Sequence, residues 1–426
     1  MSALHKESSV DCLRAVMVSG LNKISAAFSR KALVAFFSII SLTFGACADG
    51  NLTSTVRVVR DKQIQVPFPP RFSIPPVVEY MQFLHLDWSA TTGEIAASAI
   101  QGFYVHLVNP DTGVTRSINV VEYASGRHLA WLPNTTLLVI KGSLLDRYGN
   151  VQVYDMAGDT TKPALNRFMS LPTTLKGITL PDGKPAFVAL GEPKPSSVEN
   201  GVKYYAYIHA GPDWSPVQKV QVFPNDGTTY HIQQATVRQT PNGIYAAIHA
   251  HQVIRPGGAR LPDGSWQTSI SQEDAFIVNL STGKTLCQID VYEGDPTTDG
   301  RSSSASYGIA LSASARWIAL STGKMFDFYD VKTCKRIYRL AGKDFDPRGA
   351  GFIAPVFTAD EKYLILAGSD VRTREGGYLN VWRVGDGKLI YHDEELRPQA
   401  LTVDPKSNRF VIGHDQGQLT LFHIED

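Results

Sequence analysis

The chain has 426 residues, of which 43% are hydrophobic, 10% aromatic and 19% charged, and this composition excludes a disordered chain. Its formal net charge of +1 gives no basic excess of the kind that nucleic-acid binding requires. Four cysteines exclude a small disulfide scaffold and a multi-cysteine zinc array. The 35 glycines and 24 prolines favour many short strands joined by turns.

The N-terminal segment has the features of an export signal. An apolar run, Ala32 to Phe44, follows basic residues and precedes small ones, which is typical of a secretory signal. The run is shorter than the roughly 20 residues that cross a bilayer, so we expect no transmembrane helix in the mature chain. Because Met17 also begins an ordinary signal, Met1 and Met17 are both candidate start residues. The basic residues are Lys23, Arg30 and Lys31.

Two cleavage sites are compatible with this signal. Phe44 to Cys47 resembles the lipidation motif of bacterial lipoproteins, although Phe44 replaces the leucine usual there. The resemblance implies that Cys47 is lipidated and, because Ala48 is not aspartate, that the anchor lies in the outer membrane and faces the periplasm. The alternative is ordinary cleavage after Ala48, since Ala46-Cys47-Ala48 fits the A-x-A rule. The product would then be a soluble periplasmic protein.

Cys287 and Cys334 are the two cysteines beyond the export segment. An even pair in an oxidising compartment favours a disulfide. Two separate buried thiols are the alternative, because unpaired cysteines are common in protein cores. The sequence does not supply the Cα–Cα distance that would distinguish them.

A unit of paired strands recurs along the chain. An alternating apolar strand reaches a turn with Asp, Asn or Ser and Gly, and a second apolar strand follows. A further hairpin precedes each unit, so each repeat makes a four-stranded antiparallel sheet. Seven repeats of roughly 40–50 residues predict an all-β, seven-bladed β-propeller. The third strands begin near Gly102, Asn150, Lys203, Ala275, Met325, Tyr378 and Gln418.

The long spacing between Lys203 and Ala275 is assigned to a loop at Gln252–Asp274. The seventh repeat stops at Asp426 after three strands, which would leave an unpaired sheet edge. Ser54–Asp61 (STVRVVRD) reads as a strand without a hairpin partner. We therefore expect this strand to become the outer strand of the last blade and to close the ring.

Three regions follow from these assignments. Residues 1–48 form the export segment, and residues 49–79 hold a linker and the closing strand. Residues 80–426 form the propeller, which makes a single domain together with residues 54–61.

Residues 54–426 resemble the WD-repeat family of seven-bladed propellers and its bacterial periplasmic relatives. No repeat carries the Gly-His and Trp-Asp pairs of that family, so the periodicity is the main support. A lipoprotein propeller family with quinoprotein-type repeats and a role in outer-membrane assembly has turns like Ser281-Thr282-Gly283-Lys284, but its usual Trp after the Gly is absent. The residues that carry the WD-repeat resemblance are Tyr154-Asp155, Tyr329-Asp330, Val381-Trp382-Arg383, Pro181-Asp182-Gly183 and Pro241-Asn242-Gly243.

One histidine group is the only candidate for site chemistry in the sequence. There is no Gly-x-Ser-x-Gly elbow, P-loop or Cys-x-x-Cys motif. His249 and His251 lie two apart on a predicted strand and so share a face, and His231 could approach them at the channel. A third ligand would let them hold zinc, but none has a suggestive local spacing. We therefore predict no metal and no cofactor.

The remaining candidate is a binding surface made by loops at one end of the propeller. Loops on a rigid scaffold often carry binding residues, and Arg and Trp are the best interface anchors. The candidate partner-binding residues are Arg255, Arg260, Trp266, Arg301, Arg348, Arg372 and Arg374.

We predict a non-enzymatic propeller scaffold of the bacterial cell envelope that binds another envelope protein through this loop surface. It would contact the membrane only through its lipid anchor. One alternative is a propeller enzyme or enzyme subunit that resembles lactonases or amine-dehydrogenase large subunits. The other alternative is a glycan or small-molecule binder.

Overall fold

The structure is a computed structural model. It describes residues 56–67, 83–99, 104–119, 128–142, 150–158, 164–168, 172–191, 204–224, 230–255, 270–291, 308–321, 326–340, 350–352, 355–370 and 377–426. The predicted export segment and Cys47 therefore lie outside the described residues. Val56–Glu425 form one compact unit.

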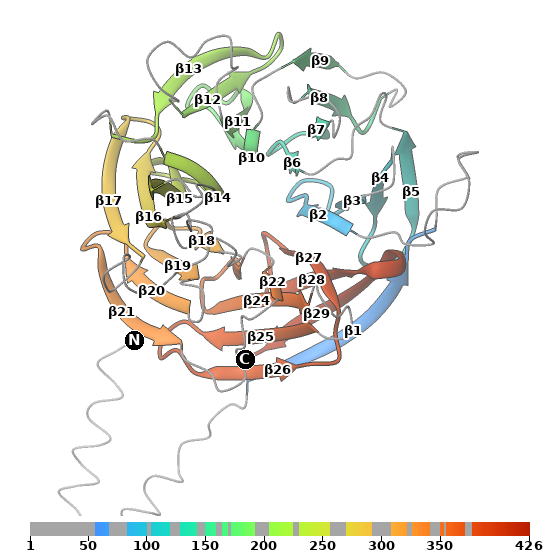
Figure 1. The fold of residues 1–426 in the computed structure, drawn as a ribbon. Helices are drawn as coiled ribbons and strands as arrows, with labels where there is room; N and C mark the ends of the chain where they lie inside the picture. The colour runs from blue at the N-terminus through green and yellow to red at the C-terminus, as the bar shows by residue number, and fades with distance from the viewer. Residues whose placement is uncertain are drawn as a thin grey trace, which may run out of the picture. The chain divides into compact units, whose positions relative to one another are not determined.

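Seven antiparallel sheets surround a central axis, as Figure 1 shows. We number them as blades in chain order. Blade 1 holds β2 (Phe83–Trp88), β3 (Ile95–Ala99), β4 (Tyr104–Val108) and β5 (Thr115–Asn119). Blade 2 holds β6 (His128–Trp131), β7 (Leu137–Gly142), β8 (Asn150–Asp155) and β9 (Leu165–Phe168). Blade 3 holds β10 (Pro172–Thr179), β11 (Pro185–Gly191), β12 (Tyr205–Ala210) and β13 (Ser215–Gln221).

The other blades repeat this pattern. Blade 4 holds β14 (Tyr230–Thr240), β15 (Gly243–Arg255), β16 (Ile270–Asn279) and β17 (Lys284–Asp290). Blade 5 holds β18 (Ile309–Leu311), β19 (Trp317–Ser321), β20 (Phe326–Asp330) and β21 (Lys335–Leu340). Blade 6 holds β22 (Ala350–Phe352), β23 (Val356–Phe357), β24 (Tyr363–Asp370), β25 (Gly377–Arg383) and β26 (Leu389–Asp393). Blade 7 holds β27 (Pro398–Val403), β28 (Arg409–His414), β29 (Gln418–Glu425) and β1 (Arg57–Gln65), with the short 3-10 turn η2 (Asp415–Gly417) before β29.

These sheets confirm the predicted all-β, seven-bladed architecture. In each blade the first strand is innermost and the fourth is outermost. In blade 6 the inner position is shared, because β22 and β23 both pair with β24.

The N-terminal strand closes the ring, as predicted. β1 pairs antiparallel with β29, with Arg57 opposite Glu425 and Gln65 opposite Gln418. The strand extends beyond the predicted end at Asp61, because the irregularity between Arg60 and Lys62 interrupts the apolar alternation without ending the pairing. The first and the last strand of the described chain therefore pair in blade 7.

Apolar contacts between neighbouring sheets make up the core. Near the axis the blades approach closely: a Cβ placed on Gly177 of β10 would lie 2.0 Å from the backbone oxygen of Trp131 in blade 2. Aromatic rings also pack between sheets, such as Phe328 of blade 5 and Phe357 of blade 6, whose ring centroids are 5.8 Å apart. Close backbone contacts and buried rings thus hold neighbouring blades together.

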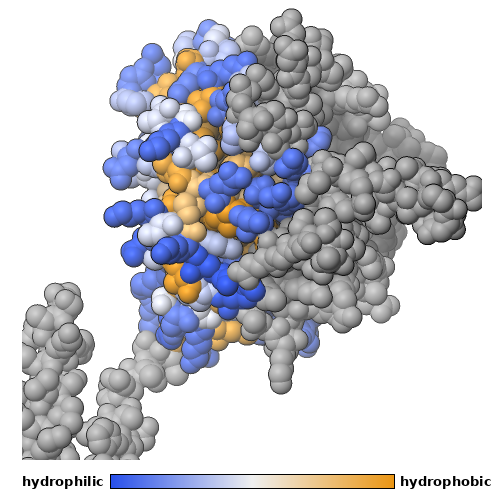
Figure 2. All heavy atoms as spheres, turned by 60° about the vertical axis from the view of Figure 1, so that its left-hand side comes forward, coloured by the Kyte–Doolittle hydropathy of each residue, from blue (hydrophilic) through white to orange (hydrophobic). Residues whose placement is uncertain are grey.

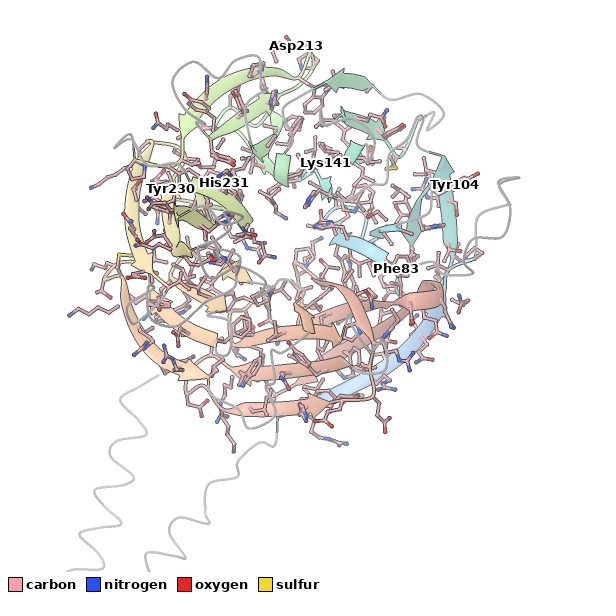
Figure 3. All side chains as sticks on the ribbon, viewed as in Figure 1. Phe83, Tyr104, Lys141, Asp213, Tyr230 and His231 are labelled. Carbon is pink, nitrogen blue, oxygen red and sulfur yellow. A yellow bond between two sulfur atoms is a disulfide. The ribbon has the colours of Figure 1, made fainter. Side chains whose placement is uncertain are left out.

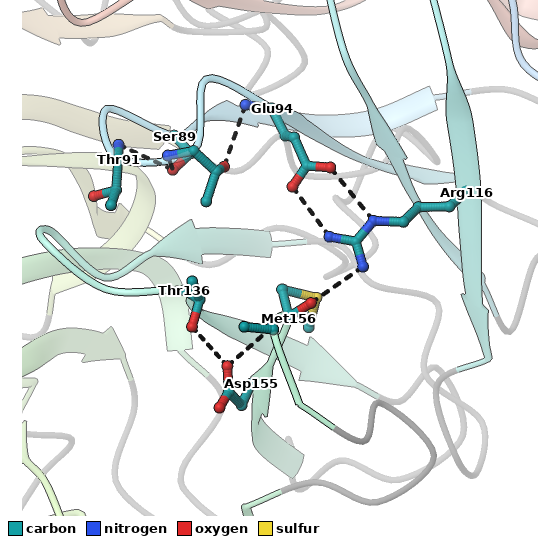
Figure 4. Close-up of polar contacts among 9 residues, drawn as sticks. Ser89, Thr91, Glu94, Arg116, Thr136, Asp155 and Met156 are labelled. Atoms are coloured by element: carbon teal, nitrogen blue, oxygen red, sulfur yellow. Dashed lines mark hydrogen bonds and ion pairs between the residues drawn. The ribbon is translucent and has the colours of Figure 1, made fainter.

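Side chains of outer strands also fasten one blade to the next. Arg116 of β5 pairs with Glu94 of its own blade at 3.1 Å and donates through Nη1 to the backbone oxygen of Met156 in blade 2 at 3.1 Å (Figure 4). Other outer strands reach the equivalent turn of the following blade in the same way. These contacts are Lys62 Nζ to Asp111 O (2.6 Å), Gln218 Nε2 to Leu280 O (3.0 Å) and the Tyr338 hydroxyl to Val384 O.

Between blades 4 and 5 two cysteines occupy this position. Cys287 lies on β17, and Cys334 lies in the turn between β20 and β21. They form a disulfide, and their Cα atoms are 5.6 Å apart, within the usual range for such a bond. Cys334 has a positive φ of 56°, where the corresponding turns of blades 4 and 6 have Gly283 and Gly387. The bonded cysteine therefore occupies a position where glycine is conformationally easier.

A buried histidine makes stability depend on pH. His106 of β4 is fully buried; its Nδ1 lies 2.8 Å from Ser117 Oγ, and its Nε2 has no hydrogen-bond partner among the described residues. Burial lowers the pKa of His106 from 6.5 to about 4. Between these values the unfolded chain binds more protons than the folded chain, so the free energy of unfolding decreases as the pH falls through this window.

We expect His106 to account for a loss of about 2.5 kcal/mol between pH 7.5 and pH 4.5. Urea unfolding of the wild type and of His106→Gln at both pH values measures it. The variant should lose less stability on acidification than the wild type by about this amount. Parallel pH profiles for the two proteins would show that His106 is not responsible.

Candidate functional site

The two ends of the propeller differ in the length of their connections. We call one end the turn face. There, turns join the first strand to the second and the third to the fourth. Most of these turns are tight, such as 241–242 between β14 and β15, and the longest is 156–164 between β8 and β9. At the other end, the loop face, connections join the second strand to the third and each blade to the next. The long ones include 256–269 between β15 and β16 and 291–308 between β17 and β18. The loop face is where the predicted partner-binding loops belong.

The structure describes one of the predicted partner-binding residues. Arg255 is the last residue of β15 and pairs with Ile270 of β16. The other six, Arg260, Trp266, Arg301, Arg348, Arg372 and Arg374, lie outside the described residues. Their role in binding stays a prediction.

The loop predicted at Gln252–Asp274 is too long. β15 continues to Arg255 and β16 begins at Ile270, so both strands of blade 4 extend into the predicted loop. Val253 and Ile254 are adjacent apolar residues and Ser271–Asp274 are polar, so neither stretch shows the apolar alternation that predicts a strand. Blade 4 thus has the longest hairpin of the described chain, directed toward the loop face.

The three predicted histidines do come together on blade 4. His231 of β14 pairs across the strands with His251 of β15, and their rings stack with centroids 5.1 Å apart. His249 precedes His251 by two residues on the same strand, as predicted. The Tyr204 hydroxyl lies 3.4 Å from His231 Nδ1, and the Gln233 side chain contacts His251 Nδ1. Figure 3 shows His231 at the inner side of blade 4, toward the centre of the ring.

Glu273 of β16 completes this group, which we call the histidine group. His249 Nε2 lies 2.9 Å from Glu273 Oε2, and both side chains are buried. Glu273 is also directly opposite His251 in the strand register. The group therefore extends from the inner edge of blade 4 into its packed interior, where a carboxylate and an imidazole face each other away from water.

Burial also shifts the pKa values of two side chains in and beside the histidine group, His251 and Asp274. It lowers the pKa of His251; Glu273 partly opposes this shift, whereas His231 and His249 add to it. Burial raises the pKa of the neighbouring Asp274, whose Oδ1 is 3.5 Å from Gln288 Nε2. His251 is thereby favoured as a neutral ring that can accept a proton, which is a property that acid–base catalysts share with structural histidines.

No group of three or more His, Cys, Asp or Glu side chains in the described ranges has an arrangement suited to a metal ion. In the same ranges, no helix has the length and apolarity needed to span a bilayer.

A cleft lies on the turn face, between blades 5 and 6. Its volume is about 410 Å³. Blade 5 contributes the side of the cleft that holds β19, β20 and β21, and blade 6 contributes two turns and the start of β24. Arg316 packs over the Trp317 ring at 4.1 Å beside it. The lining residues are Trp317, Phe328, Ile337, Tyr338, Glu361, Lys362, Tyr363, Arg383, Val384 and Gly385.

Neither Glu273 nor the cleft was predicted from the sequence. Glu273 is distant from His249 along the chain, and only the strand register brings them together; the polar triplet Gln272-Glu273-Asp274 before an apolar strand was the available signal. The cleft residues come from two repeats. Each is an ordinary strand or turn residue in its own repeat, so no local pattern marks them.

Comparisons with known proteins add little beyond the fold. No model of a protein family matches the chain, and no curated protein matches it. Among solved structures, the chain is similar to the Myceliophteria thermophila Cps50 (Swd1) beta-propeller domain. The two share 11% sequence identity over 87% of this chain and 100% of that chain, with a TM-score of 0.49. The seven sheets themselves, rather than this match, establish the propeller.

Proposed function

We propose that this protein is a non-enzymatic scaffold of the bacterial cell envelope that binds a partner protein through its loop face. The observation that carries the proposal is the asymmetry between the two ends, with short turns on one and long connections such as 256–269 and 291–308 on the other. Long connections on a rigid frame are where binding residues are usually found. The envelope location is proposed from the predicted export signal and from the predicted lipidation motif at Cys47.

The propeller ring is suited to holding the binding loops at fixed positions. β1 closes the ring by pairing with β29, and contacts between outer strands and following turns fasten several pairs of blades. A closed ring of packed sheets keeps the ends of the loops at fixed positions, so less conformational entropy is lost on binding. The lipid anchor would confine these loops to one membrane surface.

Site-specific photo-crosslinking in the native envelope tests the proposal. A photoreactive residue at position 266 or 372 should capture one reproducible protein, whereas the same residue at Asp182, in the turn-face connection between β10 and β11, should not. Trp266→Ala and Arg372→Ala, each crosslinked from the other position, should lower recovery at least tenfold, which corresponds to about 1.4 kcal/mol of lost binding free energy.

Thermal unfolding of the two variants separates binding from folding. We expect both to unfold at the wild-type temperature, because neither residue lies in the described core. Equal partner recovery with both substitutions would contradict the placement of the site on these loops.

The histidine group favours a second candidate function, as an enzyme or enzyme subunit. Its buried His249–Glu273 pair and the lowered pKa of His251 are compatible with proton transfer. This candidate predicts that a ligand bound near the ring centre changes the titration of His231 and His251 by NMR. A glycan binder, in contrast, would leave these histidines unaffected and bind through the loops.

A further inference from the structure

The cleft between blades 5 and 6 is bordered by Ile337 of β21, one of several exposed apolar residues on the outer wall of the propeller. On β13, β17 and β21 a register irregularity leaves one extra residue facing outward: Val217, Leu286 and Ile337. Each is an exposed apolar residue, with 57%, 37% and 46% of its surface exposed. Figure 2 shows such apolar residues among polar ones on this outer wall. Of these three residues, Ile337 lines the cleft described above.

Aromatic side chains make the cleft a receptor for a large apolar group. Phe328 and Tyr363 are buried at its base, and Trp317 and Tyr338 are half-buried. The Tyr338 hydroxyl donates to Val384 O across the blade boundary, so its ring is held in place. A preformed aromatic cleft of about 410 Å³ is in the size range of small-ligand and side-chain pockets.

Near the cleft, the cations without an ion-pair partner among the described residues outnumber the carboxylates without one. Arg316, Lys335 and Lys388 are exposed and form no ion pair within the described residues. Of the acidic groups nearby, Asp386 is paired with Arg383, whereas Glu361 lines the cleft and accepts from the Ser314 hydroxyl at 2.8 Å without an ion pair in the described residues. Asp330 interacts electrostatically with Arg316. The three cations outnumber the one described carboxylate without an ion pair, so this surface favours anions.

Lys335 and Lys388 come from the two blades that form the cleft, and each lies within a few residues of a lining residue in the chain. Lys335 lies two residues before Ile337 on β21. Lys388 follows Gly387, where an added Cβ would lie 3.0 Å from the Tyr338 ring. An occupant of the cleft would thus have cations on either side of its apolar group.

We propose that this cleft binds a short acidic peptide segment of a partner protein, with an aromatic or branched apolar side chain seated among Trp317, Phe328 and Tyr338. Neighbouring carboxylates of the peptide would pair with Arg316, Lys335 and Lys388. The site is independent of the loop face and would give the propeller a second attachment at its opposite end. The recessed shape of the site favours a peptide over an anionic lipid surface. Proteins that bind a bilayer insert protruding apolar residues into it, whereas a recess can hold a side chain of a peptide.

Selection from a random twelve-residue displayed peptide library tests the proposal. The wild-type propeller should enrich peptides in which Asp or Glu flanks Trp, Phe, Tyr, Leu or Ile. The best peptide, synthesised with a fluorophore, should bind at least tenfold more weakly to Ile337→Ser and to the charge-reversed Lys335→Glu. Raising the salt concentration should weaken binding to the wild type.

Val217→Ser is the matched control, since it removes the equivalent exposed residue from blade 3, which does not line this cleft. It should bind the peptide like the wild type, and all three variants should unfold at the wild-type temperature because the residues are exposed. Enrichment of peptides without acidic residues, or equal binding by Ile337→Ser, would overturn the proposal. Binding to phosphatidylglycerol vesicles that depends on Ile337, without selection of acidic peptides, would assign the surface to a membrane instead. Loss of the loop-face partner would leave the peptide result unaffected.

Discussion

Removal of residues 1–65 is expected to open the propeller and to lower the free energy of unfolding by about 5 kcal/mol or more. β1 supplies the outer strand of blade 7, and its register runs from Arg57–Glu425 to Gln65–Gln418. Ile64 is buried in the apolar cluster shared by blades 7 and 1, and the next member of that cluster, Val66, is the first residue that remains. The loss would also expose the edge of β29 to pairing with other chains. Urea unfolding and size-exclusion chromatography measure both effects.

Removal of residues 1–55 is the matched control, because it leaves the whole of β1. This variant should unfold like the mature protein. A synthetic peptide of residues 56–67, added to the shorter variant, should restore part of the lost stability by pairing with β29. An unchanged unfolding midpoint after removal of residues 1–65 would mean that blade 7 is stable with three strands.

Arg339→Met is expected to lower the free energy of unfolding by about 3 kcal/mol, because it leaves a carboxylate buried without its main partner. Asp327 of β20 is fully buried, and Arg339 of β21 binds it with two hydrogen bonds of 2.7 and 2.8 Å. Arg336 lies 3.7 Å from the same carboxylate and would offset part of the loss. Equilibrium unfolding in urea gives the value.

The double variant Asp327→Leu/Arg339→Met removes both charges and isolates the cause. It should be more stable than Arg339→Met alone, since no unpaired buried charge remains. If the double variant were as unstable as the sum of the two single changes, the loss would come from packing and not from the unpaired carboxylate.

The sequence was sufficient for the fold because each blade is built from local hairpins. Alternation and turn residues mark both strands of a hairpin within one short stretch of sequence, and the repeat then multiplies the signal. The limits of strands were harder to predict where polar residues lie within them. β1 continues past Asp61, and β15 and β16 extend into the predicted loop at Gln252–Asp274, because pairing to a neighbouring strand does not require an apolar side chain.

The candidate site was predictable only in part. His249 and His251 could be placed on one face because strand alternation is a local rule, whereas their partners depend on register between strands. Glu273 beside His249, and the cleft made by Trp317 and Lys362 from different blades, result from contacts between distant segments. Chemistry that depends on such contacts leaves no spacing to recognise.

The fastenings between blades differ from one boundary to another, and this has a consequence for how the chain finds its order. Arg116 reaches Met156 with a guanidinium, Gln218 reaches Leu280 with an amide, and Tyr338 reaches Val384 with a hydroxyl, while Cys287 and Cys334 form a disulfide. Repeats of similar shape can exchange places during folding, and identical contacts would not distinguish the right neighbour from a wrong one. The three hydrogen bonds all end on a backbone carbonyl of the equivalent turn, so a wrong neighbour could accept them as well. The disulfide, in contrast, needs a cysteine on both blades, so it is the contact that makes blade 4 and blade 5 specific neighbours.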